Sequence, residues 1–246
     1  MDNCLIVIPA RYGSQRFPGK VLALLAGKPV IQWCWEAAVK AGLGEVVIAT
    51  EHESVLKFAR SIGARAVMTS PRCQSGTDRV HEAARASKAE LILNMQGDEP
   101  FMTAAALKKA FAKLKASPDC QVGTACSRIY DLKDINNPNC VKVAMSAAGR
   151  ALYFSRCPVP FHHELSNLEG YPYYKHCGFY IYRRAALEKF VKLKPSPLER
   201  LERLEQLRAL ENGMNICVAE VPPLGPAIDV PADLKAAAAF LKKRKA

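Results

Sequence analysis

The chain has 246 residues, 50% of them apolar, which is enough to bury one large core or two small ones. A formal net charge of +12 favours an acidic partner: nucleic acid, a membrane surface or an anionic small molecule. The nine cysteines are scattered without a Cys-x-x-Cys pair, which argues against structural zinc or a disulfide framework and is typical of a reducing cytosol. The N-terminus lacks a basic signal segment, and no apolar stretch is long enough to span a membrane. We therefore expect a cytoplasmic protein without membrane insertion.

Short apolar runs alternate with amphipathic segments in the first half of the chain. This alternation predicts βαβ units around a parallel sheet. The expected strands are residues 4–10, 45–50, 64–69 and 91–93. Four helices are expected between these strands. The first begins at Pro29 and stops at Gly42, and the second runs over 53–61 and is closed by Gly63. The third starts near Val80, and the fourth runs over 103–115.

In the second half this alternation fades, so strands of mixed direction are expected. They are residues 122–126, 140–145, 152–154, 176–182 and 215–221. Leucines at a spacing of three predict one helix over residues 196–213, buried on several faces because the spacing drifts around a helix. A last helix follows Leu234. The overall expectation is an α/β fold.

The turn at residues 94–100 follows an apolar strand and contains Gly97 and Pro100, which end the strand. Asp98 and Glu99 therefore lie at the carboxyl end of a strand, where open α/β sheets bind ligands. Paired carboxylates at this place suit Mg²⁺ held jointly with substrate phosphates. The alternative is a plain acidic turn.

The loop after the first strand, residues 11–20, carries three cations, two glycines and a serine. Glycines let a backbone approach phosphates, and Arg and Lys donate charge-assisted hydrogen bonds to them. The loop matches neither the P-loop nor the dinucleotide-binding pattern. Phosphate binding is favoured over an ordinary basic loop.

Three further positions leave alternatives open. In the polar segment 69–79, Ser75 or Thr77 could simply cap a helix, or the segment could read the edge of a nucleotide base. Glu205 lies on the leucine-lined side of the predicted helix, so it is either paired with Arg208 or Arg200, or functional. Asp229 could cap the last helix or supply a second metal carboxylate.

Seven motifs, in order, resemble the 3-deoxy-manno-octulosonate cytidylyltransferase family, the CMP-Kdo synthetases. They are R-Y-G-S-Q-R-F-P-G-K, V-M-T-S-P-x-x-Q-S-G-T-D-R, N-M-Q-G-D-E-P, A-L-Y-F-S-R, K-H-C-G-F-Y-I-Y, P-S-P-L-E-R-L-E-x-L-E-Q-L-R and I-D-V-P-A-D-L. The resemblance implies a nucleotidyltransferase-like, Rossmann-like, three-layer fold with a mostly parallel mixed sheet flanked by helices. It implies one domain over residues 1–246, with a nucleotide-binding part to about residue 130 and a sugar-binding and dimerisation part from about residue 131.

The resemblance also implies an enzyme that transfers CMP from CTP to 3-deoxy-manno-octulosonate (Kdo), releasing pyrophosphate, with Mg²⁺ as cofactor. It implies a cytoplasmic homodimer that serves lipopolysaccharide biosynthesis. Carried over by motif, the CTP-binding residues would be Arg11, Ser14, Arg16, Lys20, Thr69, Gln74, Ser75, Arg79, Gln96 and Asp98. The metal ligands would be Asp98 and Asp229, and Lys20 and Arg11 would join them as catalytic residues. The sugar-binding residues would be Gln96, Arg156, His176, Tyr180, Glu205 and Gln206.

Arg156 offers a planar fork for the sugar carboxylate, or alternatively pairs with Glu164 or Glu205. His176 and Tyr180 are four apart on a predicted strand, hence on one face.

The chain departs from the commoner family pattern at Cys177 and in the stretch 161–163.

One alternative function is a cytidylyltransferase for a related acidic sugar, such as 8-amino-Kdo or a sialic acid. A nucleic-acid-binding module, suggested by the net charge, would need stacking aromatics or a basic stripe, and neither is visible.

Overall fold

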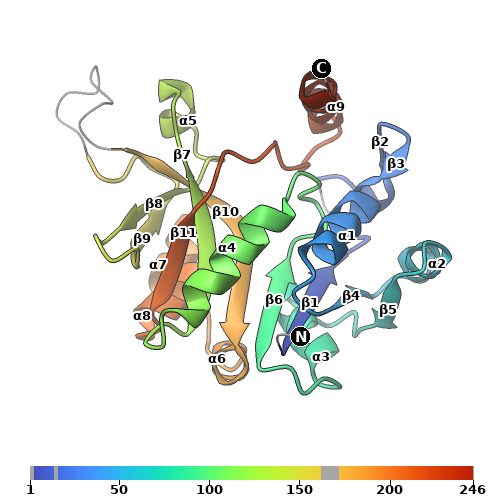
Figure 1. Ribbon diagram of the computed structural model, residues 1–246, viewed down its shortest axis with the longest axis horizontal. Helices are drawn as coiled ribbons and strands as arrows, with labels where there is room; N and C mark the ends of the chain where they lie inside the picture. The colour runs from blue at the N-terminus through green and yellow to red at the C-terminus, as the bar shows by residue number, and fades with distance from the viewer. Residues whose placement is uncertain (1–2, 14–15, 162–171, 246) are drawn as a thin grey trace. The chain divides into compact units, whose positions relative to one another are not determined.

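The computed structural model describes residues 3–13, 16–161 and 172–245 (Figure 1). The chain forms two compact units. Unit 1 comprises residues 1–108 and 224–246, and unit 2 comprises residues 109–223. The C-terminal segment therefore returns to the unit that contains the N-terminus.

Unit 1 is built on parallel strands in the order β6-β1-β4-β5. These strands are β1 (Cys4–Pro9), β4 (Glu45–Thr50), β5 (Arg65–Met68) and β6 (Leu91–Met95). The connecting helices are α1 (Val30–Ala41), α2 (Glu53–Ser61) and α3 (Gly76–Ala84), and the chain ends in α9 (Asp233–Lys245). A short helix η1 (Lys20–Leu22) and the paired strands β2 (Leu24–Leu25) and β3 (Lys28–Pro29) precede α1.

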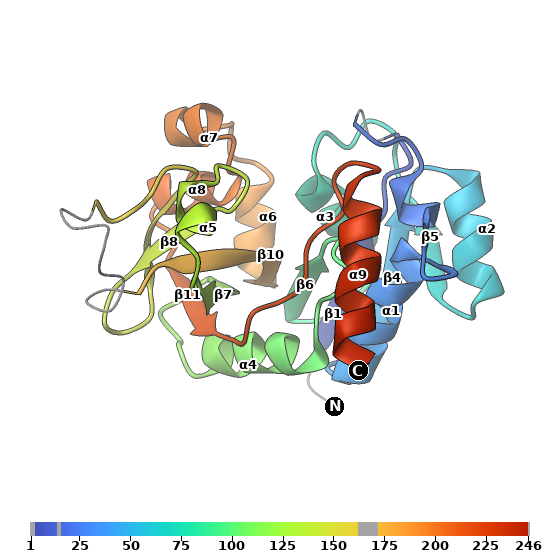
Figure 2. The ribbon, with the colours of Figure 1, turned by 90° about the horizontal axis from the view of Figure 1, so that it is seen from above.

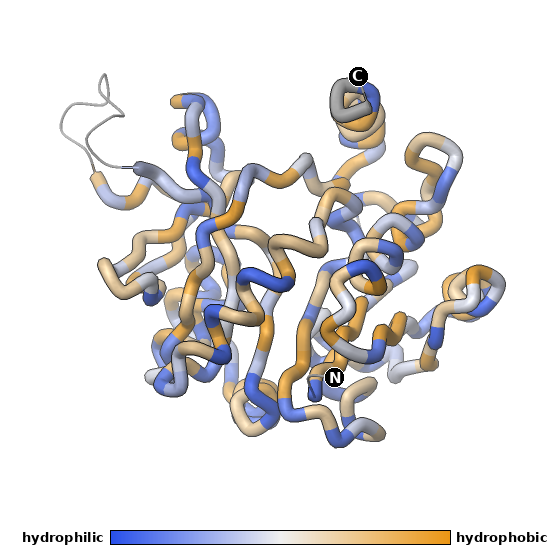
Figure 3. Tube along the Cα trace, in the orientation of Figure 1, coloured by the Kyte–Doolittle hydropathy of each residue, from blue (hydrophilic) through white to orange (hydrophobic). Residues whose placement is uncertain are grey.

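The apolar runs form the centre of unit 1, as predicted. All six residues of β1 are buried, and β1 and β6 are coloured as hydrophobic in Figure 3. Helices α1 and α3 lie on opposite sides of these strands, which gives three layers (Figure 2). Gly42 ends α1 in the left-handed conformation, and Pro29 directly precedes this helix instead of opening it.

Unit 2 is built on strands of mixed direction, which confirms the predicted change. They are β7 (Val122–Arg128), β8 (Lys142–Met145), β9 (Ala151–Ser155), β10 (Tyr174–Arg183) and β11 (Ile216–Glu220). Strand β7 pairs with β11 in parallel and with β10 antiparallel, and β8 pairs antiparallel with β10 and β9. The helices of unit 2 are α5 (Leu132–Asn136), α6 (Arg184–Phe190), α7 (Pro197–Glu202) and α8 (Gln206–Glu211). Helix α4 (Ala104–Lys115) leads from unit 1 into unit 2.

The prediction of one helix over residues 196–213 is wrong. The chain makes two helices, α7 and α8, separated at Arg203, which has a left-handed backbone with φ 53°. Leu201 is 80% exposed, so the leucines do not all face a core. A spacing of three matches no straight apolar stripe, and the break lets Leu204 and Leu207 be buried while Leu201 faces solvent.

The predicted α/β fold class is confirmed by these pairings, because β6, β1, β4 and β5 pair in parallel, β11 pairs with β7 in parallel, and helices connect the strands. Among the helices that the structure describes, none is both long enough and apolar enough to cross a membrane.

Candidate active site

One ammonium group joins the two predicted metal carboxylates in unit 1. Lys20 Nζ forms an ion pair with Asp98 Oδ2 and lies 3.6 Å from Asp229 Oδ1. Arg16 Nη2 lies 3.0 Å from the same oxygen of Asp229. The main-chain N–H of Ile228 donates to the carbonyl of Asp98 over 3.0 Å, which holds the two acidic segments together. The structure thus brings together three predicted motifs from distant parts of the sequence.

Two glycines make this convergence possible. A Cβ on Gly97 would lie 2.9 Å from the carbonyl oxygen of Pro9, so only glycine lets the acidic turn pack on the end of β1. Gly19 has φ +69° and donates its N–H to the carbonyl of Tyr12 over 2.8 Å. This bond closes the loop after β1 and brings Lys20 back to the strand ends.

The pair of carboxylates fits a hard divalent cation, because both already lie against one cationic group. In the part of the chain that the structure describes, no group of three or more His, Cys, Asp or Glu side chains is arranged to hold a metal. Mg²⁺ commonly takes only one or two protein carboxylates and completes its shell with water and substrate phosphates. The arrangement therefore suits a metal that binds with its substrate.

Arg79 is buried, with 1% exposure, beside the end of the sheet. Its guanidinium pairs with Glu51 over 2.9 Å and donates to the hydroxyl of Thr69. The other carboxylate oxygen of Glu51 accepts the main-chain N–H of Tyr12 over 2.9 Å. Arg79 and Thr69 therefore hold the loops that follow β1, β4 and β5. Glu51 was missed in the sequence, although it follows β4 as Asp98 follows β6.

Ser75 caps α3, since its hydroxyl accepts the N–H of Asp78 over 3.1 Å and Asp78 accepts the N–H of Ser75 in return. The capping alternative for residues 69–79 is thus confirmed for Ser75. A second chain of contacts runs from Gln96 to the side chain of Asn94 over 3.2 Å, and from Asn94 to the hydroxyl of Thr77 over 3.3 Å. The predicted CTP-binding residues Arg11 and Gln74 are exposed, and Ser14 lies outside the described residues.

Arg156 follows β9 in unit 2, as predicted, but its partners differ from those expected. The guanidinium donates to the carbonyl oxygens of Glu202 over 2.7 Å, Pro138 over 2.9 Å and Arg203 over 3.4 Å. Three of the five N–H groups of the guanidinium thus contact main chain. These contacts tie the turn before β8 to α7 and reduce the donors available for a substrate carboxylate. The alternative partner Glu164 lies outside the described residues.

Lys142, which the sequence analysis missed, is fully buried beside Arg156. Its ammonium donates to the carbonyls of Cys140 over 2.6 Å, Arg156 over 2.6 Å and Asn137 over 2.9 Å. Burial lowers the pKa of Lys142. Lysine within a strand carries no sequence signal for such a role. Lys142 thus links the carbonyl of Arg156, the predicted sugar-binding arginine, to the turn at residues 137–140.

His176 lies on β10 and is buried. Burial lowers the pKa of His176 to about 3, so its ring is neutral near pH 7. The hydroxyl of Thr124 donates to the carbonyl of Phe179 over 2.7 Å, and its oxygen lies 3.0 Å from Nε2 of His176. When the single hydroxyl proton of Thr124 points to the carbonyl of Phe179, Nε2 of His176 donates to the hydroxyl oxygen and Nδ1 is left as the acceptor nitrogen. The rings of His176 and Tyr180 are 5.3 Å apart, so the prediction that they share one side of the strand is confirmed despite a register shift after Cys177.

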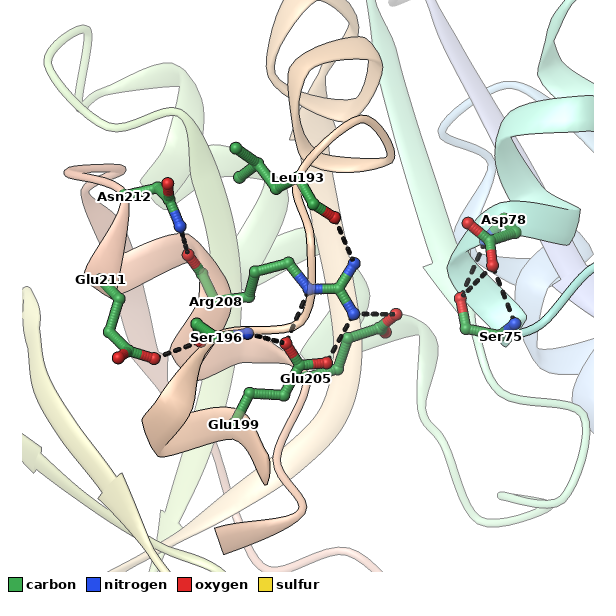
Figure 4. A network of polar contacts seen from close by, with 9 residues as sticks. All are labelled: Ser75, Asp78, Leu193, Ser196, Glu199, Glu205, Arg208, Glu211 and Asn212. Atoms are coloured by element: carbon green, nitrogen blue, oxygen red, sulfur yellow. Dashed lines mark hydrogen bonds and ion pairs between the residues drawn. The ribbon is translucent and has the colours of Figure 1, made fainter. Parts of the chain in front are cut away.

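Glu205 lies at the start of α8, directly before the buried Gln206. Its carboxylate is 3.9 Å from Nη2 of Arg208, which confirms the paired alternative (Figure 4). Arg208 is held more tightly by Glu199, through contacts of 2.5 Å and 2.7 Å. This network fixes α7 and α8 around the left-handed residue Arg203.

The chain matches the family model described as Cytidylyltransferase over residues 5–216. It is 46% identical to the 3-deoxy-manno-octulosonate cytidylyltransferase of Elusimicrobium minutum, with 98% of this chain and 99% of the relative covered. It is 48% identical to the protein of the same name from Solibacter usitatus, with 96% and 93% covered. The chain belongs to the 3-deoxy-manno-octulosonate cytidylyltransferase family. This confirms the family indicated by the seven motifs.

Solved structures agree with this membership. The structure of CMP:2-keto-3-deoxy-manno-octonic acid synthetase complexed with CTP matches with a TM-score of 0.91 and 39% identity, covering 98% of this chain and 99% of that one. The 4-diphosphocytidyl-2C-methyl-D-erythritol synthase of Anaerococcus prevotii matches with a TM-score of 0.64 but 13% identity, which shows the shared fold alone. As a cytidylyltransferase family member, the chain is an enzyme, a nucleotidyltransferase.

Proposed function

We propose that this cytidylyltransferase transfers CMP from CTP to Kdo and releases pyrophosphate. The observation that carries the proposal is the match to the CMP-Kdo synthetase solved with CTP, which covers 98% of this chain at 39% identity with a TM-score of 0.91. The names of the relatives favour Kdo over a related acidic sugar.

Residues of unit 1 would bind the nucleotide CTP. Arg11, Arg16 and Lys20 would bind the CTP phosphates, because Arg and Lys form charge-assisted bonds with phosphate oxygens. The segment 69–79 and Gln96 would line the cytidine, held in shape by the Arg79–Glu51 pair. Asp98 and Asp229 would hold Mg²⁺, which when bound polarises the α-phosphate and lowers the charge that the reaction must build up.

The sugar side falls to unit 2 and Gln96. Neutral His176 would accept a sugar hydroxyl at Nδ1, and Tyr180, Glu205 and Gln206 would bind further hydroxyls. Arg156 would face the sugar carboxylate with the N–H groups that its main-chain contacts leave. The sugar hydroxyl attacks the α-phosphorus in line, and no covalent enzyme intermediate is needed, so the residues act mainly by positioning and by neutralising charge.

Release of pyrophosphate tests the proposal. The enzyme is incubated with CTP and Mg²⁺, with and without Kdo. We expect release only when Kdo is present. Release with a sialic acid but not with Kdo would support the alternative sugar, and release from CTP alone would indicate hydrolysis.

We further propose a homodimer that acts in the cytoplasm in lipopolysaccharide biosynthesis, on the strength of the family resemblance. Light scattering on the purified protein tests the assembly. A mass of twice 27.0 kDa is expected, and a mass of 27.0 kDa would contradict it.

A further inference from the structure

Lys20 occupies the place between two carboxylates that a divalent cation would need. Its ammonium contacts Asp98 and lies 3.6 Å from Asp229, and it also lies 3.4 Å from the carbonyl of Ile228. The side chain is only 13% exposed. The ammonium is thus an internal counter-ion that offsets part of the negative charge of the acidic pair and is surrounded by oxygen atoms.

A metal ion and this ammonium cannot share these oxygens. Mg²⁺ takes oxygen ligands at about 2.0–2.1 Å in a near-octahedral shell, and a positive charge among its ligands repels it. A metal that binds Asp98 and Asp229 through the oxygens now in contact with the ammonium must therefore displace Lys20. The residue has a place to go, because its long flexible stem belongs to the loop proposed to bind phosphates, and Arg16 can likewise exchange Asp229 for a phosphate.

We propose that Lys20 is an internal competitor of the divalent cation, which keeps Asp98 and Asp229 together in the nucleotide-free enzyme and yields them to the metal when a triphosphate takes its ammonium. This inference rests on the proposed metal role of the two aspartates. Because linkage is reciprocal, the metal and the triphosphate then strengthen each other's binding. Metal alone binds weakly, so the acidic pair is not loaded before the nucleotide arrives.

Binding of Mn²⁺ without nucleotide tests the inference, since free Mn²⁺ is measured directly by electron paramagnetic resonance. The wild type is compared with Lys20→Met, which removes the charge at similar length, and with Lys20→Arg, which keeps it. We expect Lys20→Met to bind Mn²⁺ at least about tenfold more tightly than the wild type, and Lys20→Arg to resemble the wild type. Lys20→Met binding no more tightly would overturn the inference.

The double variant Lys20→Met with Asp98→Asn separates this inference from the proposed function. If Asp98→Asn weakens Mn²⁺ binding but Lys20→Met does not strengthen it, only the competition is wrong. If Asp98→Asn has no effect in either background, the aspartates are not the metal site. Thermal melting checks that the variants fold. Lys20→Met should melt below the wild type in metal-free buffer, and added Mn²⁺ should raise its melting temperature more than that of the wild type. An equal gain in both proteins would also count against the competition.

Discussion

Asp98 and Asp229 differ in how firmly the structure holds them, although both are proposed to bind the metal. Asp98 is fixed by the turn after β6 and by the close packing at Gly97, whereas Asp229 has a side chain that is 47% exposed and paired with two cations. Their shared contact with Lys20 makes a joint role the simplest account of both.

Asp98→Asn and Asp229→Asn should each lower kcat by at least about a hundredfold, because the metal is expected to contribute several kcal/mol to stabilising the transition state. Asn keeps the shape of the side chain, so the melting temperature should change little. Steady-state rates in Mg²⁺ check this, with the exposed Asp134→Asn of unit 2 as the control. A near-normal rate in either variant would remove that residue from the metal site.

His176 links stability to pH. Its pKa in the folded protein, about 3, lies below the ordinary value of 6.5. At a pH between these two values, the unfolded chain binds a proton at this residue and the folded chain does not. The contribution of neutral His176 to the free energy of unfolding is therefore fully present above pH 6.5 and is lost as the pH falls below this value. The loss amounts to at most about 1.4 kcal/mol per pH unit.

Urea unfolding at several pH values between about 4.5 and 7 measures this slope. The variant His176→Phe keeps a ring against Phe154 but cannot titrate. We expect its free energy of unfolding to fall less steeply with decreasing pH than that of the wild type. Parallel slopes for the two proteins would show that His176 does not carry the effect.

Arg156 has two roles in this account. Its guanidinium links separate main-chain segments, and it is proposed to face the sugar carboxylate. Arg156→Lys should raise the KM for Kdo more than the KM for CTP, because a lysine lacks the bidentate fork. The melting temperature should also fall, as the three carbonyl contacts depend on the guanidinium shape. A lower melting temperature with an unchanged KM for Kdo would leave Arg156 a purely structural role.

The C-terminal helix positions the segment that carries Asp229. Phe240 of α9 packs edge-to-face on Phe101, with ring centres 4.8 Å apart, and Gly225 lies so close that a Cβ there would be 2.5 Å from Phe101. The carboxylate of Asp233 accepts the N–H of Asp229 over 2.8 Å. The packing of α9 and the cap at its start thus fix both ends of the segment.

Phe240→Ala should therefore weaken Mn²⁺ binding several-fold, because aromatic pairs of this kind contribute about 0.5–1.5 kcal/mol beyond the apolar area that they bury. The exposed Lys242→Ala on the same helix serves as the control and should leave binding unchanged. Equal Mn²⁺ affinities for wild type and Phe240→Ala would show that α9 does not position Asp229.

Elements that depend on the pattern of neighbouring residues could be predicted from the sequence. Elements that depend on contacts between residues far apart in the sequence could not. The parallel strands of unit 1 are continuous apolar runs, and Gly42 stops α1 by its own backbone freedom. The break at Arg203 depends instead on Arg208 reaching back to Glu199, which no periodicity encodes. The place of Asp98 at a strand end was predictable because it follows an apolar run, and its joint role with Asp229 was implied by the family resemblance. The burial of Lys142 depends instead on carbonyls from two separate segments, residues 137–140 and Arg156.

The net charge of the whole molecule agrees with its proposed substrates. Both CTP and Kdo are anions, and an excess of positive charge raises the rate at which anionic ligands are captured. The cations that we propose to bind the CTP phosphates belong to the loop after β1, at the carboxyl end of a parallel strand. A salt dependence of kcat/KM for CTP is expected on this basis.

The mass of the product formed from an equimolar mixture of CTP and ATP with Kdo and Mg²⁺ tests the central claim most directly. A site that reads a pyrimidine edge by hydrogen bonds rejects an unmatched base strongly. The account predicts CMP-Kdo as the dominant product, with the AMP adduct at a small fraction of it. Equal amounts of the two adducts, or no adduct of Kdo at all, would contradict it.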